Sequence, residues 1–414
     1  MKPISNYKFC EAVNGLKSHL LCMLFLLPAV LASVTTANAQ TPLQAQLGAR
    51  PLTPTEIANT NYALPADTEV SGGLLNVGVG QPVYLEADVN LAIPAADITS
   101  VTWTLNSAPM GSKAALTTSP LGANVPVYQP SDQLVSQVAG RTLLRPDLAG
   151  SYTVTATVVS ASEGTTNLTL TITAGTYMGI NTCALCHSGG QIAENKVVPW
   201  QGTLHATMFS EAIDGLKSSH YNASCIRCHT VGYDTNTNAV NGGFDDVAAA
   251  LGWTFPTVLT NGNWAAMQAN YPQLANLANI QCENCHGPGS QHAALLGNTT
   301  ATNWPSVAVS YDSGDCAQCH DDMPNHSHVA EWNNSLHAIT TRDPAGNASC
   351  VGCHTGKGFV QRIDGVTNNI DTAYVPINCQ TCHEPHGDTM PTNNPHMIRA
   401  MTSVTFMDGT VVTN

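Results

Sequence analysis

The pentapeptide Cys-x-x-Cys-His occurs six times between residues 183 and 383, and this repetition constrains the fold more than any other feature of the sequence. In each copy two thiols separated by two residues fall on one turn of backbone, and an imidazole follows directly. From Cys183 to the end of the chain there are 232 residues, or about 39 for each copy. So little chain cannot bury an ordinary hydrophobic core around each copy, so groups bound by the motifs must form most of it.

Cys-x-x-Cys-His is the attachment signature of c-type haem. The thiols add to the two vinyl groups of a porphyrin, and the histidine lies under the iron as its proximal ligand. Paired Cys-x-x-Cys units also build zinc sites, but zinc does not require a histidine after every second cysteine, and all six copies have one. The sequence predicts six haem c groups and no catalytic side chains. The predicted attachment thiols and proximal histidines are Cys183, Cys186 and His187; Cys225, Cys228 and His229; Cys282, Cys285 and His286; Cys316, Cys319 and His320; Cys350, Cys353 and His354; and Cys379, Cys382 and His383.

The N-terminus has the pattern of an export signal. Three lysines precede an apolar run over 20–34, and Ala37-Asn38-Ala39 is a cleavage site of the A-x-A kind. The run is too short to span a bilayer, and no later segment approaches that length. Without residues 1–39 the fourteen cysteines lose Cys10 and Cys22, and the remaining twelve are those of the six motifs. We therefore expect an exported protein, periplasmic, outer-surface or extracellular, with no transmembrane segment and no disulfide.

The charge of the chain bears on its partners. The formal net charge is −14, and about −16 remains after residues 1–39 are removed. An acidic surface disfavours nucleic acid and anionic membrane as partners. It is compatible with redox proteins or an extracellular electron acceptor, and with further copies of the chain joined through haem–haem contacts.

The half of the chain before the motifs has a different composition. Residues 40–66 are rich in Gln, Thr, Pro and Ala without periodicity, and we expect a tether there. Residues 67–174 hold no cysteine or histidine and alternate like half-buried antiparallel strands, with Tyr152, Val154, Ala156 and Val158 on one face of a strand. The stretch from Pro146 to Val154 resembles the late-strand pattern of immunoglobulin-like sandwiches. We predict an all-β immunoglobulin-like sandwich that acts as a spacer or docking module.

The region 175–414 is predicted to be a mostly α-helical and irregular cytochrome domain built from two three-haem repeats, at about 183–295 and 316–396. Trp-x-x-Thr-Leu-His-Ala at 200–206 matches Trp-x-x-Ser-Leu-His-Ala at 332–338, and Asn-Ala-Ser precedes both the second and the fifth motif. The first repeat has an insertion at about 231–279. We expect it to be a lid or packing layer with the aromatic residues Trp253, Phe255, Trp264 and Tyr271. Helices are expected at 203–218, 245–251 and 329–340.

Eight further histidines lie in the cytochrome region, whereas residues 40–182 have none. This distribution indicates distal haem ligands, although the sequence leaves open which histidine serves which haem. Methionines 178, 208, 323 and 397 are alternatives, with packing favoured for them. The distal candidates are His205, His220, His292, His326, His337 and His386, with His328 and His396 in reserve.

With these motifs the chain resembles the multihaem cytochromes c that include the nitrifiers' tetrahaem cytochrome, octahaem tetrathionate reductase and hydroxylamine oxidoreductase. It is also similar to secreted hexahaem cytochromes of metal-reducing bacteria. Trp-x-x-[Ser/Thr]-x-His-Ala and the stretch Cys-x-x-Cys-His-Gly-Pro-Gly-x-x-His at 282–292 carry the likeness, which covers 177–400. The resemblance implies His205, His337 and His292 as distal ligands. The Cys-x-x-Cys-Lys haem of the nitrite-reducing branch does not occur here.

Two functions follow from these features. The favoured one is a non-enzymatic cytochrome that relays electrons through six bis-histidine haems between the cell envelope and an external or periplasmic acceptor. The alternative is a haem enzyme that reduces or oxidises a small nitrogen or sulfur compound at one haem without a distal ligand. The surplus of histidines favours the relay.

Overall fold

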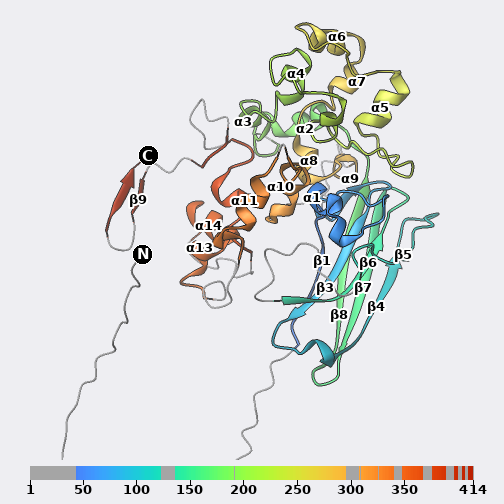
Figure 1. Ribbon diagram of the computed structural model, residues 1–414, viewed down its shortest axis with the longest axis vertical. Coiled ribbons are helices and arrows are strands. Elements are labelled where there is room, and N and C mark those ends of the chain that lie inside the picture. The colour runs from blue at the N-terminus through green and yellow to red at the C-terminus, as the bar shows by residue number, and fades with distance from the viewer. Residues whose placement is uncertain are drawn as a thin grey trace, which may run out of the picture. The chain divides into compact units, whose positions relative to one another are not determined.

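A computed structural model describes residues 43–122, 136–190, 192–294, 307, 309–324, 326–339, 347–366, 375–387, 396–399, 403–405 and 409–413. The predicted signal at 1–39 lies outside the described residues. The chain from Thr41 onward forms one compact unit. It has a β-rich N-terminal region and a C-terminal region of short helices and irregular backbone (Figure 1).

The β-rich region has two four-stranded sheets, ordered β1-β3-β6-β5 and β2-β8-β7-β4. The neighbouring strands are antiparallel except for β2 and β8, which are parallel. Buried side chains from both sheets share one hydrophobic cluster, so the sheets pack face to face. The strands are β1 (Ala45–Ala49), β2 (Asn76–Gly78), β3 (Val83–Asn90), β4 (Ile98–Ser107), β5 (Leu116–Thr117), β6 (Ser136–Leu144), β7 (Gly150–Ser160) and β8 (Gly164–Gly175).

The alternation predicted for β7 is confirmed, because Tyr152, Val154, Ala156 and Val158 are all fully buried. The hydroxyl of Tyr152 donates to the carbonyl of Leu148 at 2.9 Å and satisfies the polar end of a buried ring. Such a tyrosine, bonded to backbone a few residues upstream, also occurs in immunoglobulin-like sandwiches, an assignment that stays a prediction for this region.

The expected tether is wrong for residues 43–66, which belong to the fold. Strand β1 pairs with β3, and helix α1 (Pro54–Ala58) begins at Thr53 with a capping box that includes Glu56. A short 3₁₀ helix, η1 (Thr60–Tyr62), follows, and η2 (Ala95–Asp97) lies before β4. Strand β1 is too short for its polar and apolar residues to show a clear period, so pairing with β3 decides its conformation.

The C-terminal region is built from helices of at most eight residues. They are α2 (Ile180–His187), α3 (Val197–Trp200), α4 (Met208–Ile213), η3 (Ala223–Arg227), α5 (Phe244–Leu251), α6 (Asn263–Asn270), α7 (Pro272–Ala275), α8 (Cys282–His286), α9 (Ser290–Ala293), α10 (Ser313–His320), α11 (His328–Asn333), η4 (Leu336–Ala338), α13 (Val351–His354), α14 (Gly356–Ile363) and α15 (Cys379–Cys382). Strands β9 (Ser403–Thr405) and β10 (Val411–Thr413) pair near the C-terminus. In the part of the chain that the structure describes, none of the helices is long and apolar enough to cross a membrane.

Two of the three expected helices are shorter than predicted. The helix expected at 203–218 forms only over α4, because the carbonyl of His205 accepts a hydrogen bond from the amide of Ile280 and the backbone before α4 turns. The helix expected at 329–340 divides into α11 and η4, whereas α5 matches its prediction within one residue. Tertiary hydrogen bonds override helix propensity in such short segments.

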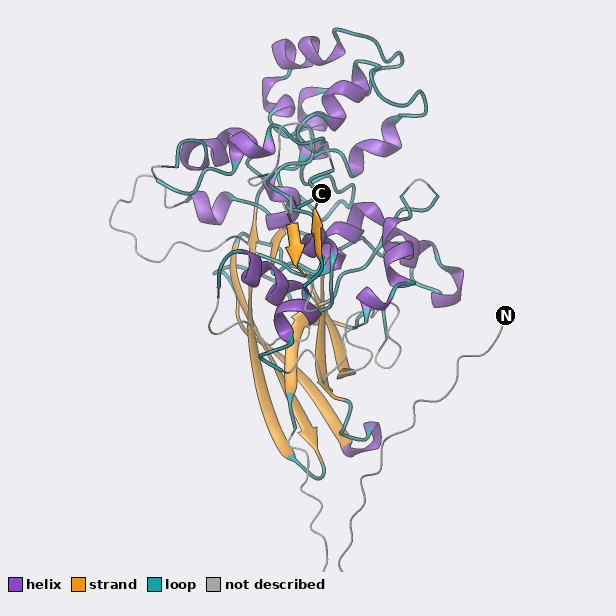
Figure 2. Ribbon diagram, turned by 90° about the vertical axis from the view of Figure 1, so that its left-hand side faces the viewer, coloured by secondary structure: helices purple, strands orange, loops and turns teal. Residues whose placement is uncertain are grey.

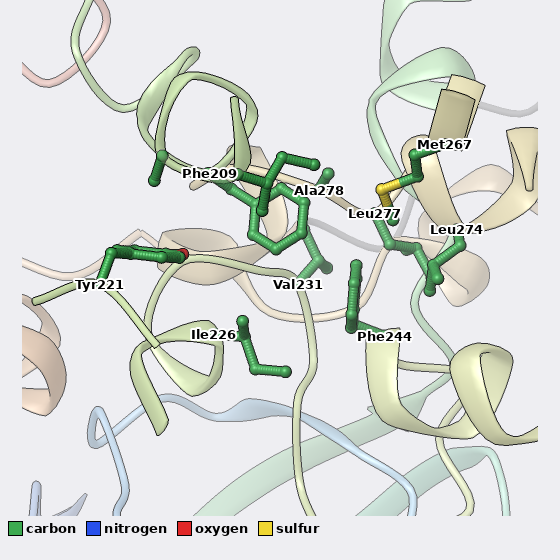
Figure 3. Packing of buried hydrophobic residues seen from close by; sticks show 11 residues of the cluster. Phe209, Tyr221, Ile226, Val231, Phe244, Met267, Leu274, Leu277 and Ala278 are labelled. Atoms are coloured by element: carbon green, nitrogen blue, oxygen red, sulfur yellow. The ribbon is translucent and has the colours of Figure 1, made fainter. Parts of the chain in front are cut away.

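The insertion in the first repeat packs with α4 and residues 221–226 into one hydrophobic cluster (Figure 3). Phe209 and Phe244 are fully buried, with ring centres 5.5 Å apart in an edge-to-face arrangement. The predicted packing residues Trp253, Phe255, Trp264 and Tyr271 cover this cluster. Among the described residues, no hydrophobic cluster includes a residue beyond Ala278. The described part of the second repeat therefore has no comparable core of side chains.

Candidate haem-binding sites

Each Cys-x-x-Cys-His motif lies on a helical turn, as the spacing requires. Five motifs lie on the α-helices α2, α8, α10, α13 and α15 or at their ends, and the second lies on η3. Asn222, Asp312 and Asn378 accept hydrogen bonds at the starts of η3, α10 and α15, and so hold these turns in place. None of the twelve motif cysteines is in a disulfide. Two thiols on one turn with an imidazole beside them are the donor set that covalent haem attachment needs.

Thiols of different motifs lie close to each other in three pairs. Cys183 pairs with Cys282, Cys228 with Cys319, and Cys316 with Cys379. The first pair joins the first and third motifs, and the last joins the fourth and sixth. These two contacts are therefore equivalent in the proposed repeats. No metal-binding group of three or more His, Cys, Asp or Glu is found in the described ranges.

Glu283, within the third motif, explains why the first and third motifs lie together. Its side chain is buried, and its carboxylate accepts hydrogen bonds from the amides of Gly179 at 2.7 Å, Gly289 at 2.6 Å and Met178 at 3.0 Å. Burial raises the pKa of this carboxyl, and the three amides oppose the rise. Through Glu283 the start of α2 is fixed to α8.

Three imidazole pairs link a proximal candidate to a distal candidate from another part of the chain. The ring centres of His187 and His292 are 6.5 Å apart, those of His205 and His320 are 6.2 Å apart, and those of His286 and His386 are 6.0 Å apart. Two imidazoles on opposite sides of one metal ion have ring centres about 6 Å apart, from two metal–nitrogen bonds of about 2 Å and about 1 Å within each ring. The spacing of these pairs fits bis-histidine haem.

His320 has two further neighbours. The ring of His326 lies 5.9 Å from it and that of His328 lies 6.0 Å from it. His328 is exposed and faces Glu331 at 3.7 Å, whereas His326 is half-buried. His205 and His326 are therefore the better placed alternatives beside the fourth motif.

The other distal candidates are not brought into such pairs among the described residues. His220, His337 and His396 are exposed, and so is the proximal candidate His354 of the fifth motif. The backbone carbonyl of His396 accepts a hydrogen bond from Nδ1 of His383 at 2.7 Å. His396 thus contacts the sixth motif through its backbone.

Sequence reasoning missed the groups that hold the outer ring nitrogens. His187 donates from Nδ1 to the carbonyl of Glu194 at 3.2 Å, and Nδ1 of His229 lies 3.1 Å from the hydroxyl of Tyr221. Nδ1 of His386 lies 3.0 Å from a carboxylate oxygen of the buried Glu384. Such partners orient a ligating ring and raise its basicity. Only the position of Glu384, directly after His383, could have suggested its role.

The electrostatics favour neutral imidazoles, the form that ligates a metal. Burial lowers the pKa of His229 and of His320 to about 4, and neighbouring histidines contribute to both shifts. Burial also lowers the pKa of His205, with a smaller effect from His383. A buried cationic imidazole would be costly, so these rings keep a lone pair available.

Local hydrogen bonds recur between the two proposed repeats. Nε1 of Trp200 donates to the carbonyl of Ile280 at 3.0 Å, and Nε1 of Trp332 donates to the carbonyl of Ile377 at 2.8 Å. The hydroxyls of Thr203 and Ser335 donate to the carbonyls of these tryptophans, at 2.8 and 2.7 Å. The matching sequence elements thus have matching contacts.

Comparison with known proteins agrees with this chemistry. The family model described as cytochrome c7 and related cytochrome c matches residues 301–384, which include the last three motifs. The C-type polyheme cytochrome OmcB from each of two strains of Geobacter sulfurreducens is 28% identical over 215 residues, or 48% of this chain and 26% of the relative. The chain thus covers about a quarter of the length of these relatives. Together with the motifs and the paired histidines, these matches support a multihaem c-type cytochrome, a class whose chemistry is electron transfer.

Proposed function

We propose that this protein relays electrons through six covalently bound haem c groups, each with two histidine ligands, between the cell envelope and an external or periplasmic acceptor. The observation that carries the proposal is the spacing of the three cross-motif histidine pairs at 6.0–6.5 Å. A side chain placed to fill the second axial position leaves no site for substrate, which favours a relay over an enzyme.

The residues have distinct roles in this proposal. The motif cysteines hold the groups, and the motif histidines and their partners supply the axial ligands. The structure supports His292 as the partner of His187, His386 as the partner of His286, and His205 or His326 as the partner of His320. When bound, haem supplies one-electron chemistry at its iron, and the chain positions it and excludes water from it.

Contacts between motifs support closely spaced groups. The thiol pairs Cys183/Cys282 and Cys316/Cys379 link motifs within each repeat, and Cys228/Cys319 links the two repeats. An ion pair of 2.6 Å between Arg227 and Asp322 supports the last contact. Because attachment thiols of neighbouring motifs lie close to each other, the haems that they would hold lie close together as well. Such closeness is what transfer from one group to the next requires.

Partners and location belong to the same proposal. An acidic chain with an export-type N-terminus suits a redox partner or acceptor outside the cytoplasm, and further copies of the chain are a third class of partner. The alternative, a haem enzyme for a small nitrogen or sulfur compound, requires one open haem. The fifth motif is where we would search for it, because His354 is exposed.

The experiment that tests the proposal combines haem stoichiometry with spin state. Intact mass and a pyridine haemochrome assay should give six haems c and no thiol that an alkylating reagent can modify after unfolding. Electron paramagnetic resonance of the oxidised protein should show low-spin haem throughout, and carbon monoxide should bind poorly to the reduced protein. Fewer haems would contradict the cysteine assignment. A high-spin signal with stoichiometric ligand binding would replace the relay by the enzyme.

A further inference from the structure

The junction between the two proposed repeats lies between the third motif, on α8, and the fourth, on α10. One direct hydrogen bond joins the motifs there, from Nε2 of Gln318 to the carbonyl of Asn284 at 3.0 Å. Helices gather at one end of the strands (Figure 2), and α8 and α10 are among them (Figure 1). The β-rich region contacts both motifs, although its sequence offers no haem ligand.

The first contact is made by Asn76, a buried residue at the start of β2. Its Nδ2 donates to the carbonyl of His286 at 2.9 Å and to that of Pro288 at 3.0 Å. Gly287, between them, has φ of +72°, and a Cβ there would lie 2.1 Å from the carbonyl oxygen of Asn76. The Gly-Pro-Gly that follows the third motif is therefore shaped to lie against β2. A further hydrogen bond, from the amide of Thr176 to Oγ of Ser290 at 2.8 Å, extends this contact.

The second contact is made by α1 and the residue before it. Asp321, which directly follows the proximal candidate His320, is buried. Its carboxylate accepts from Oγ1 of Thr53 at 2.6 Å, and its carbonyl accepts from the amide and Oγ1 of Thr55 at 3.0 and 2.7 Å. A Cβ at Gly314, near the start of α10, would lie 2.2 Å from Pro51. The β-rich region thus holds α10 at both of its ends.

Resting on the function proposed above, we infer that the β-rich region is a positioning element that spans the repeat junction and fixes the third and fourth haem sites relative to each other. Asn76 and Thr55 are its positioning residues. Asn76 donates a hydrogen bond to the backbone carbonyl of the proximal candidate His286, and Thr55 donates one to that of Asp321, the residue after the proximal candidate His320. Both lie on elements of the β-rich region. A site supported by rigid helices and strands keeps its geometry more precisely than a site supported by loops. The region is therefore part of the electron path's architecture, beyond the spacer or docking module expected from the sequence.

Single substitutions in the full-length, haem-loaded protein test this inference. Asn76→Ala removes both bonds to the third site, and Thr55→Val removes the hydroxyl bond to the fourth without changing the shape of the side chain. Thr55→Ser keeps the hydroxyl and is the conservative control. Asn167→Ala is a second control. It removes, on the exposed part of β8, an amide oxygen that accepts a hydrogen bond from the hydroxyl of Thr157 within the β-rich region. The probes are haem count by mass, an optical redox titration, the g-values of the low-spin haems, and hydrogen exchange at 286–290 and 320–322.

We expect Asn76→Ala and Thr55→Val to keep all six haems but to shift two components of the redox titration and the corresponding g-values. Exchange should rise about tenfold at the affected segment, the effect of losing about one hydrogen bond. The Thr55→Ser and Asn167→Ala proteins should match the unmodified protein. Unchanged titrations and g-values in both test variants would overturn the inference, even if exchange rises. The proposed function is judged separately, since it fails when the unmodified protein lacks six low-spin haems.

Discussion

The imidazole of His286, in the third motif, lies 6.0 Å from that of His386, which follows the sixth motif, and the two rings are within 13° of parallel. The two residues are a hundred positions apart, and they belong to different proposed repeats. His205 of the first repeat and His320 of the second form a further such pair. Two of the three candidate pairs therefore join the proposed repeats, whereas His187 and His292 both lie in the first.

The first prediction concerns His386. Replacing it with alanine should convert one of six haems to high spin, because the ring that faces His286 is removed. Attachment should stay complete, since it depends on the cysteines and the proximal histidine. Electron paramagnetic resonance and intact mass measure the two effects. His328→Ala, at an exposed histidine outside these three pairs, is the matched control. A fully low-spin His386→Ala protein would remove this histidine from the ligand set.

The second prediction separates the neighbours of His320. We expect His205→Ala or His326→Ala to produce one high-spin haem, and His328→Ala to produce none, because the His328 side chain is 75% exposed. His337→Ala tests the equivalent of His205: one high-spin haem would show that the matching sequence element predicts the ligand, and none would show that the exposure of His337 does. A high-spin signal from His328→Ala alone would show that the exposed ring moves onto the iron.

The third prediction concerns pH. Burial raises the pKa of Asp234 to about 6, with additional repulsion from Glu69 and Asp245. A folded-state pKa above the unfolded value means that the folded protein binds the proton more tightly, so this residue's contribution to stability is lost as pH rises from about 4 through 6. Asp234→Asn should therefore stabilise the protein more at pH 7 than at pH 4, as measured by the difference in Tm from the unmodified protein. An equal difference in Tm at pH 4 and pH 7 for Asp234→Asn would contradict the prediction.

The sequence predicted what is local. The helical turn at each motif follows from its spacing, and the inward face of β7 follows from strict alternation. The folded segment at 43–66 could not be predicted, because β1 depends on pairing with β3 and α1 is held by Asp321, more than 250 residues away. The pairing of each proximal histidine with a distal histidine could not be predicted either. No local pattern joins His187 to His292; their rings come together where Glu283 of α8 accepts hydrogen bonds from the backbone just before α2 and just before α9.

The last prediction concerns the reduction potentials. Histidine on both sides of the iron should keep all six potentials below that of a histidine–methionine cytochrome. Within this set Glu384 should lower one further, because a carboxylate beside Nδ1 of His386 makes that ring a stronger donor and stabilises the oxidised iron. Glu384→Gln should raise one component of an optical redox titration and leave the haem count unchanged. Glu194→Gln is the matched control, because His187 is bonded to the backbone carbonyl of Glu194, which that change retains, while the carboxylate pairs with Lys196. Equal shifts in the two variants would mean that surface charge acts on the potentials. A shift confined to Glu384→Gln would assign His386 to a haem and show that Glu384 lowers the potential of that haem.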